Sequence, residues 1–321
     1  KFLRAFQYFD LVRNFGGVPL VIGLKLPSEV VGITRATIEQ SYEQIERDLK
    51  EAIPALPKRS EYAANDLGRV TEGAAQGLLA KVYLYRKNYQ EVVNELAPVV
   101  AAIHAGKDLM LVPMPQTFPN DLKTSKDIIF AVQYLKGGVG ESVHQNNCYR
   151  NNDNGNIISL EQAEFESDKD NRKALVEPTG SGQRPGKFNA PATNNETSAD
   201  FPVMRCAEVM LMYAEAANEL AAVPTQDALD ALNAVRTNAG LEGKTLAELS
   251  TKTLFRQAVY KERRLELALE CDRWFDIVRT GQMAAIFPGI DAYRQLYPVP
   301  QTEIENVNDK AGWQNEGYAL E

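Results

Sequence analysis

The sequence predicts a mainly α-helical fold in which tetratricopeptide-like helix pairs pack against an irregular, loop-rich half. Apolar residues recur every three or four positions over most of 1–106 and 201–281, which is the period of an amphipathic helix. Most of the clustered Gly, Pro, Asn and Ser residues fall within 107–200, and 282–321 carries no sustained helical period. The first two ranges are therefore expected to form a helical scaffold, and the other two the loop-rich part.

The first two helices are predicted from their spacing and their terminal signals. Residues 2–15 carry phenylalanines at helical spacing, and Gly16-Gly17 is a stop signal. Thr37 followed by Gln40 is the capping-box pattern of a helix start, and Pro54 ends that second helix. The stripe that this helix is expected to bury consists of Ile38, Tyr42, Ile45, Leu49 and Ile53.

Two helix pairs resemble the tetratricopeptide pattern, which is a repeat of two antiparallel helices. The first pair is expected from Thr71 to about Arg86 and from about Tyr89 to Ala105, and the second from about Arg205 to Asn238. Gln76 occupies the place of the signature Trp. The residues at the expected offsets are Leu79, Ala80, Tyr83, Val92, Leu96, Val99, Ala228, Leu232 and Val235. A helical bundle without repeats is the alternative.

One long helix is expected from about Thr253 to Thr280, where charged residues alternate with apolar ones. Its acidic residues stand beside arginines at helical spacing, which indicates a salt-bridged helix surface. These residues are Glu262, Glu266, Asp272 and Asp276, beside Arg263, Arg264, Arg273 and Arg279. Within the loop-rich range, the apolar run 127–132 indicates a strand or a single helical turn. The chain from Pro288 onward is expected to be irregular coil.

Composition excludes several classes of protein. The net charge of −8 disfavours binding to nucleic acid or to anionic lipid headgroups. No run approaches the 18 apolar residues of a membrane helix, and polar residues interrupt the first segment too often for a signal peptide. Because the chain begins with Lys1 rather than Met, we expect that its natural N-terminal segment has been removed.

The few cysteines and histidines indicate neither a metal site nor a disulfide framework. Cys148, Cys206 and Cys271 are an odd number and form no CxxC pair. We expect all three thiols to be unbonded, with Cys206 and Cys271 buried as small apolar residues, the latter inside the long helix. His104 and His144 have no partner at metal-ligand spacing, so we expect structural roles for both.

An acidic cluster is the remaining candidate for a metal site. It resembles a calcium loop in charge, but it lacks the central Gly and the terminal bidentate Glu of such loops. A solvated loop is the favoured interpretation, and a calcium loop is the alternative. The cluster consists of Glu161, Glu164, Glu166, Asp168 and Asp170. No nucleophile–base arrangement stands out anywhere in the chain, so we expect a protein without catalysis, cofactor or metal.

Four segments in order carry a resemblance to a known family. They are KFLRAFQYFDLVRNFGGVPLV (1–21), FPVMRCAEVMLMYAEAANEL (201–220), ERRLELALECDRWFDIVRTG (262–281) and YPVPQTEIENVN (297–308). Together they resemble the SusD/RagB family of outer-membrane nutrient-binding lipoproteins, and segments 68–85 and 227–241 look like its repeat helices. The resemblance covers nearly the whole chain. One departure is Cys271-Asp272, where family members commonly have Gly-His.

The resemblance implies a single domain over 1–321, a SusD-like α–α superhelix without its N-terminal segment. It also implies a surface lipoprotein of the outer membrane that captures oligosaccharide, or another nutrient, for a SusC-type TonB-dependent transporter. The membrane would be reached only through a lipid anchor outside this chain. The first alternative is a helical-repeat scaffold that binds a protein partner without a small-molecule ligand. The second is a glycoside hydrolase.

The ligand site is expected in the loop-rich half. Sugars present apolar CH faces beside hydroxyl groups, so a binder needs exposed aromatic rings next to hydrogen-bonding side chains. The densest such combination is 146–153, although an Asn-rich series of turns explains the same residues. The candidate ligand residues are Tyr149, Arg150, Asn151, Asp153 and Phe188. The candidate structural residues are Arg205, Glu208, Tyr213, Glu215, Arg273, Trp274 and Asp276.

Overall fold

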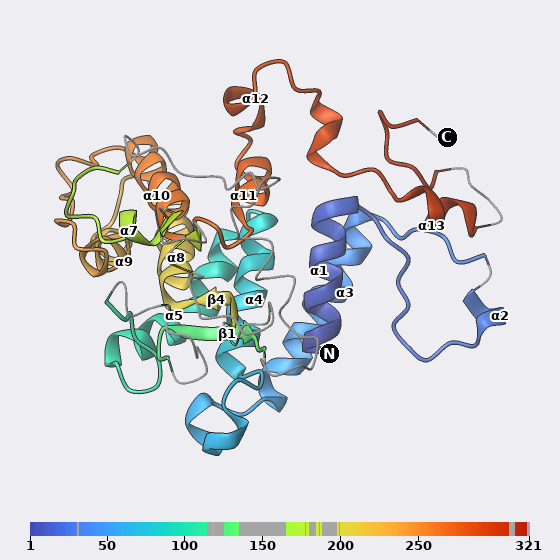
Figure 1. The fold of residues 1–321 in the computed structure, drawn as a ribbon, viewed down its shortest axis with the longest axis horizontal. Helices are drawn as coiled ribbons and strands as arrows, with labels where there is room; N and C mark the ends of the chain where they lie inside the picture. The colour runs from blue at the N-terminus through green and yellow to red at the C-terminus, as the bar shows by residue number, and fades with distance from the viewer. Residues whose placement is uncertain are drawn as a thin grey trace. The chain divides into compact units, whose positions relative to one another are not determined.

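The structure is a computed structural model, and it is mainly α-helical, as predicted (Figure 1). It describes residues 1–30, 32–113, 118, 125–134, 165–176, 178–179, 184–185, 187, 198, 200–307 and 312–319. The chain divides into two compact units, of which the first comprises Lys1–Ala55 and Trp274–Glu321 and the second Leu56–Arg273. Every described helix of seven or more residues lies within 1–106 or 201–281, the two ranges expected to form the scaffold.

The first unit is built on two packed helices, α1 (Phe2–Phe15) and α3 (Ile38–Ala52). The predicted capping box is present at the start of α3. Thr37 Oγ1 accepts a hydrogen bond from the Gln40 amide at 3.1 Å, and Gln40 Oε1 accepts one from the Thr37 amide at 2.9 Å. Ile45 is buried in the expected stripe, but Ile38 in the first turn is 41% exposed, so that part of the prediction is wrong.

Short helical turns make up the rest of the first unit. They are α2 (Pro27–Val30), η1 (Ile53–Ala55), α12 (Met283–Ile286), η6 (Ala292–Gln295) and α13 (Gln301–Glu305). The expected coil after Pro288 is therefore interrupted twice. Arg35 joins the two chain segments of this unit, because it donates to the carbonyls of Phe15 at 2.6 Å and Trp313 at 2.7 Å.

Five helices form the core of the second unit, and they follow one another as packed neighbours. They are α4 (Glu72–Tyr85), α5 (Tyr89–Ala105), α8 (Cys206–Leu220), α9 (Gln226–Asn238) and α10 (Lys252–Glu266). Helix α5 packs against α4 and α8, and α8 packs against α9 and α10 (Figure 1). All nine residues at the expected tetratricopeptide offsets are buried, so the small Ala80 and its partners form the helix contacts.

The prediction of one long helix over 253–280 is wrong, because the helix is interrupted after Glu266. Helix α10 ends there, and α11 (Arg273–Arg279) begins seven residues later. Leu269 and Cys271 adopt positive φ angles of 69° and 68° in the intervening turn, a conformation that ends a right-handed helix. Cys271 is therefore exposed in a turn, not buried in a helix as predicted, and neither it nor the buried Cys206 forms a disulfide with a described residue.

A short antiparallel ladder links the loop-rich range to the helices. β1 (Ile128–Val132) pairs with β4 (Phe201–Arg205), so the apolar run 127–132 contains a strand. Strand β4 runs directly into α8 and lies close to α4, since a Cβ atom on Gly77 would overlap the sulfur of Met204. The remaining described elements of this unit are η2 (Arg59–Glu61), η3 (Ala64–Asp66), α7 (Lys173–Val176), β2 (Pro178–Thr179) and β3 (Arg184–Pro185).

Candidate functional site

The predicted ligand residues lie in a part of the chain that the structure does not describe. These residues are Tyr149, Arg150, Asn151, Asp153 and Phe188, and the same holds for His144, Cys148, Glu161 and Glu164. The structure instead shows how the chain is held on both sides of 135–164. On the earlier side, the Tyr134 amide donates to Asp200 Oδ1 at 2.9 Å, next to the β1–β4 ladder. On the later side, Phe165 is buried against Leu265 of α10.

Arg172 anchors the chain that follows Phe165. Its guanidinium is fully buried and donates to both carboxylate oxygens of Asp170 at 2.8 Å, a bidentate pairing. A third nitrogen donates to Glu262 Oε1 at 2.5 Å and to Glu266 Oε2 at 3.3 Å. We expected Glu262 and Glu266 to form salt bridges on the helix surface. That prediction is wrong for both residues, because they are buried and bind an arginine from a distant segment.

Lys187 provides a second anchor at the end of α10. Its buried ammonium donates to the carbonyls of Glu266 at 2.7 Å and Ala268 at 2.9 Å, and to Glu270 Oε1 at 2.7 Å. Carbonyls at a helix C-terminus lack intrahelical donors, and a lysine supplies them. This contact satisfies carbonyls that α10 leaves without intrahelical donors where it ends. The ring of Phe118 lies 5.0 Å from the ammonium, within cation–π range.

Arg205, at the junction of β4 and α8, is the centre of these contacts. Its guanidinium is buried and donates to Glu270 twice at 2.8 Å, to Glu266 Oε1 and O at 3.0 Å, and to Asp127 Oδ2 at 3.2 Å. We call the buried set Asp127, Arg172, Lys187, Arg205, Glu262, Glu266 and Glu270 the anchor cluster. The cluster joins Asp127 before β1, Arg205 at the end of β4, and the described residues Arg172 and Lys187 to α10 and the turn that follows it.

Burial and charge act in opposite directions on the pKa values in the anchor cluster. Burial raises the pKa of Asp127 to about 7, although the Arg205 charge opposes the shift. Among the described residues, Asp127 Oδ1 has no hydrogen-bond partner. Burial also acts to raise the pKa of Glu270, but the charges of Arg205 and Lys187 outweigh it and hold that pKa below its usual value. Asp127 is therefore the weakly held carboxyl of the cluster.

The other predicted structural residues lie in helices of the scaffold. Glu208 is buried in α8, where its Oε1 lies 2.9 Å from Lys81 Nζ and 3.6 Å from the Arg263 guanidinium. Glu215 is buried and Tyr213 is half-buried in the same helix. In α11, Asp276 accepts a hydrogen bond from Arg279 at 2.7 Å. Arg273 and Trp274 are half-buried, and the Trp274 ring lies 6.2 Å from that of Phe287.

Three members of the acidic cluster are described, and each is paired with a base. Glu166 accepts a hydrogen bond from Arg236 at 2.8 Å, which lowers its pKa to about 2. Asp168 lies 3.0 Å from Lys173 and stays exposed. Asp170 is buried against Arg172, so the expectation of a solvated loop is wrong for this residue. Among the described residues, no three His, Cys, Asp or Glu side chains are gathered as metal ligands would be.

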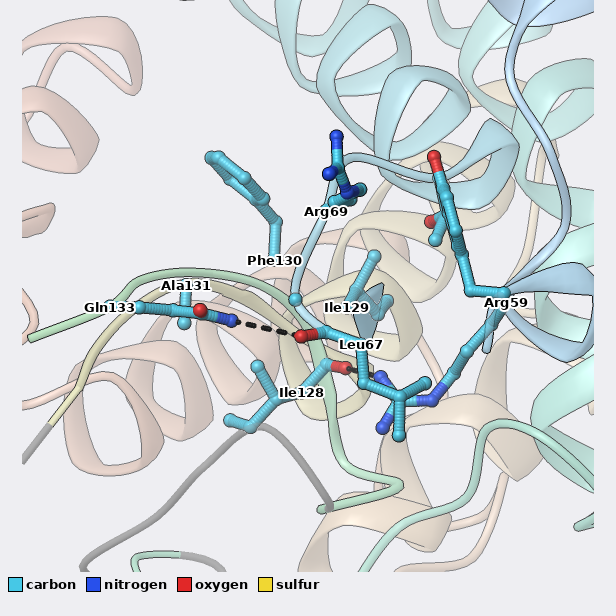
Figure 2. Close-up of a pocket in the computed structure, with 11 residues that line it drawn as sticks. Arg59, Leu67, Arg69, Ile128, Ile129, Phe130, Ala131 and Gln133 are labelled. Atoms are coloured by element: carbon cyan, nitrogen blue, oxygen red, sulfur yellow. Dashed lines mark hydrogen bonds between the residues drawn. The ribbon is translucent and has the colours of Figure 1, made fainter. Parts of the chain in front are cut away.

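A small cavity lies between β1 and the segment after η3 (Figure 2). Arg59 closes one side by donating to the Ile128 carbonyl at 3.1 Å, and Gln133 closes another by donating to the Leu67 carbonyl at 3.4 Å. The volume is about 20 Å³, which holds about one water molecule. This cavity is too small for a sugar.

A wider groove adjoins it, and Arg59 and Ile129 line both. We call it the α4–α5 groove, because the first turn of α4 and the Pro98 turn of α5 form its two walls. Its volume is about 250 Å³. Sequence reasoning did not find this groove, since its lining comes from five separate segments of the chain. The one signal available was Gln76, which lines the groove where a tetratricopeptide repeat has Trp.

Two further expectations concern the histidines and membrane helices. His104 is exposed in the last turn of α5, consistent with the C-terminal helix position expected for it. Over the described parts of the chain, every helix is too short or too polar to cross a membrane.

Comparison with known proteins gives consistent matches along the chain. A family model described as "SusD family" matches residues 145–291, and another, described as "Starch-binding associating with outer membrane", matches residues 1–84. A SusD-like protein of Formosa agariphila is 28% identical, over 99% of this chain and 73% of its own length. A SusD-like protein of Bacteroides ovatus is 25% identical, over 87% of this chain and 57% of its own length.

Solved structures share the fold. A laminarin-binding SusD-like protein superposes with a TM-score of 0.78 and 26% identity, covering 98% of this chain and 77% of its own. The surface glycan-binding protein A of Bacteroides fluxus has a TM-score of 0.79 and 22% identity, covering 99% and 77%, and this likeness concerns the fold. The two family models, the relatives and the shared fold all indicate the same family. The chain belongs to the SusD/RagB family.

Proposed function

We propose that this protein binds an oligosaccharide, or another nutrient, at the cell surface and delivers it to a SusC-type TonB-dependent transporter of the outer membrane. The observation that carries the proposal is the likeness to the laminarin-binding SusD-like protein, at 26% identity over 98% of this chain. The starch-binding, outer-membrane description of the family model over 1–84 supports the same class of ligand and location. Attachment to the membrane would be through a lipid anchor outside this chain.

We further propose that the glycan contacts Tyr149, Arg150, Asn151 and Asp153, with Phe188 as a second aromatic platform. An aromatic ring stacks on the apolar face of a sugar, while the neighbouring amide, guanidinium and carboxylate hydrogen-bond its hydroxyl groups. The described contacts support this location, because a binding loop needs a rigid frame. Both ends of 135–164 are tied to the scaffold, at Tyr134 and at Phe165. The role requires binding and release, not catalysis.

Isothermal titration calorimetry with laminarin and with starch tests the ligand class directly. The parent protein is expected to bind one of them, and Tyr149→Ala is expected to lose most of that affinity, because the stacking ring is removed. Tyr149→Phe is the matched control, since it keeps the ring and should keep most of the affinity. Equal binding by Tyr149→Ala and the parent, with both folded, would place the site elsewhere. The absence of heat with any glycan would refute the ligand class.

A further inference from the structure

The α4–α5 groove is shaped by the absence of one large side chain. In the tetratricopeptide pattern a Trp stands three residues before a Leu-Gly pair on the first helix of the repeat. Here Gln76 stands at that place, before the buried pair Leu79-Ala80, and it lines the groove. A polar side chain of smaller volume replaces the ring, and a concavity of about 250 Å³ adjoins it. The groove is open to solvent, since Lys58 and Asp108 of its lining are exposed, so a ligand could enter it.

Four polar side chains of the groove have no hydrogen-bond partner among the described residues, whereas Arg59 and Thr71 are hydrogen-bonded to the backbone. Among the described residues, no hydrogen bond or ion pair is made by the side chains of Lys58, Glu72, Gln76 or Asp108. Donors and acceptors are both present, because an ammonium and an amide N–H group face two carboxylates and an amide oxygen. Together with Arg59, the lining carries two positive and two negative charges. A ligand with a net charge gains nothing from this balance, whereas a neutral ligand with several hydroxyl groups can satisfy both kinds of partner.

The rest of the groove is aliphatic. Its apolar lining consists of Pro98, Val99, Ala102, Leu109 and Ile129. An aliphatic floor with a few convergent polar groups is the usual composition of a small-molecule site. The volume of about 250 Å³ lies just below the usual range of about 300–1,000 Å³ for drug-sized ligands, so the groove suits one ring and not a chain of rings.

We propose that the α4–α5 groove is a second, weak carbohydrate site that holds a single neutral sugar ring, either a free monosaccharide or the end of a glycan. The CH face of the ring would rest on Val99 and Ala102, and its hydroxyl groups would bond Gln76, Glu72 and Asp108. Affinity is expected near a Kd of about 1 mM, because the described floor contains no aromatic ring for stacking. The inference rests on the proposed function for its choice of sugar as the ligand.

Nuclear magnetic resonance of the amide groups tests the groove. Glucose and laminaritriose, a three-ring fragment of laminarin, are titrated to about ten times the expected Kd, and the backbone amide signals of Gly73, Gln76 and Asp108 are followed. Saturable shifts of these amides by both sugars indicate a site for a ring at the end of a glycan, and shifts by glucose alone indicate a monosaccharide site. If neither sugar moves these amides, the groove is not a carbohydrate site.

Two variants that fill the groove separate binding from indirect effects. Gln76→Trp restores the residue of the repeat, so it is expected to keep the fold and to weaken the groove binding at least about tenfold, or about 1.4 kcal/mol. Gln257→Trp makes the same change on the exposed face of α10 and should bind like the parent. Gly73→Phe fills the same space from the first turn of α4, one turn before Gln76, where an added Cβ meets no atom within 4 Å. Groove shifts that persist in both Gln76→Trp and Gly73→Phe would overturn the proposal.

The result is independent of the proposed loop site. If the proposed function is wrong, calorimetry will show no binding of polysaccharide. If only the groove proposal is wrong, the protein will still bind glycan, but the amide signals of Gly73, Gln76 and Asp108 will not shift.

Discussion

Replacing Arg205 with Met removes the central positive charge of the anchor cluster and keeps an unbranched side chain in its place. The parent guanidinium makes five hydrogen bonds, to Asp127, to Glu266 twice and to Glu270 twice. All four side chains are almost completely buried. In the variant, three carboxylates stay buried with fewer partners, and removing one member of a buried ion pair costs about 3–5 kcal/mol.

Arg256→Met is the matched control, since it makes the same chemical change at a solvent-accessible pair. Arg256 also binds a carboxylate with two nitrogens, at 2.6 Å and 2.8 Å to Glu219, but its side chain is 34% exposed. An exposed pair of this kind contributes about 1 kcal/mol or less.

Urea unfolding followed by circular dichroism gives the free energy of unfolding of each variant. In thermal unfolding, a loss of about 3–5 kcal/mol corresponds to a decrease in Tm of roughly 6–20 °C for a unit of about this size. Equal losses in Arg205→Met and Arg256→Met would show that burial does not set the strength of the anchor cluster, and would refute the reasoning.

Three further predictions concern single residues. The folded pKa of Asp127, about 7, is above its unfolded value, so its contribution to the free energy of unfolding is fully present below about pH 4 and is lost as the pH rises to about 7. Asp127→Asn should therefore flatten the decrease in stability between pH 4 and pH 8 measured by urea unfolding, and the exposed control Asp230→Asn should not. Gly77→Ala should lower the free energy of unfolding, measured with urea, by about 1–3 kcal/mol, because the added methyl group crowds Met204. In a Met204→Ala background most of that loss should disappear, and an undiminished loss would show that the contact with Met204 is not its cause. Thr37→Ser should leave Tm nearly unchanged, whereas Thr37→Ala should lose about 1 kcal/mol as the cap of α3; equal Tm values would show that the hydroxyl bond contributes nothing.

The sequence was sufficient where structure depends on neighbouring residues. Thr37 and Gln40 are three residues apart and mark a helix start, and Ala80 marks a close helix contact through its size alone. It was insufficient where distant segments decide. The helical period continues past Glu266, but the helix ends there, and the carbonyls at its end bond to Lys187, which is far away in the chain. For the same reason, the partners of Glu262 were expected on its own helix and lie instead on Arg172 and Arg236.

The same distinction between neighbouring and distant residues applies to the two candidate binding sites. Composition alone selects the segment around Tyr149, because aromatic and polar residues are adjacent there in the sequence, and its role in binding stays a prediction. The α4–α5 groove has no comparable sequence signal. Residues as far apart as Lys58 and Ile129 meet in it, and no spacing rule joins them.

The closure of both ends of 135–164 has a consequence for how such a protein changes over generations. The Tyr134 amide is held by Asp200, and Phe165 is held in an apolar cluster with Leu265, and both of these partners lie outside 135–164. Once the ends are fixed, doubling the length of the chain between them costs only about 0.6 kcal/mol of closure entropy. We therefore expect the scaffold to tolerate insertions and deletions within 135–164, so that under the proposed function ligand preference would diverge while α10 and its partners stay the same.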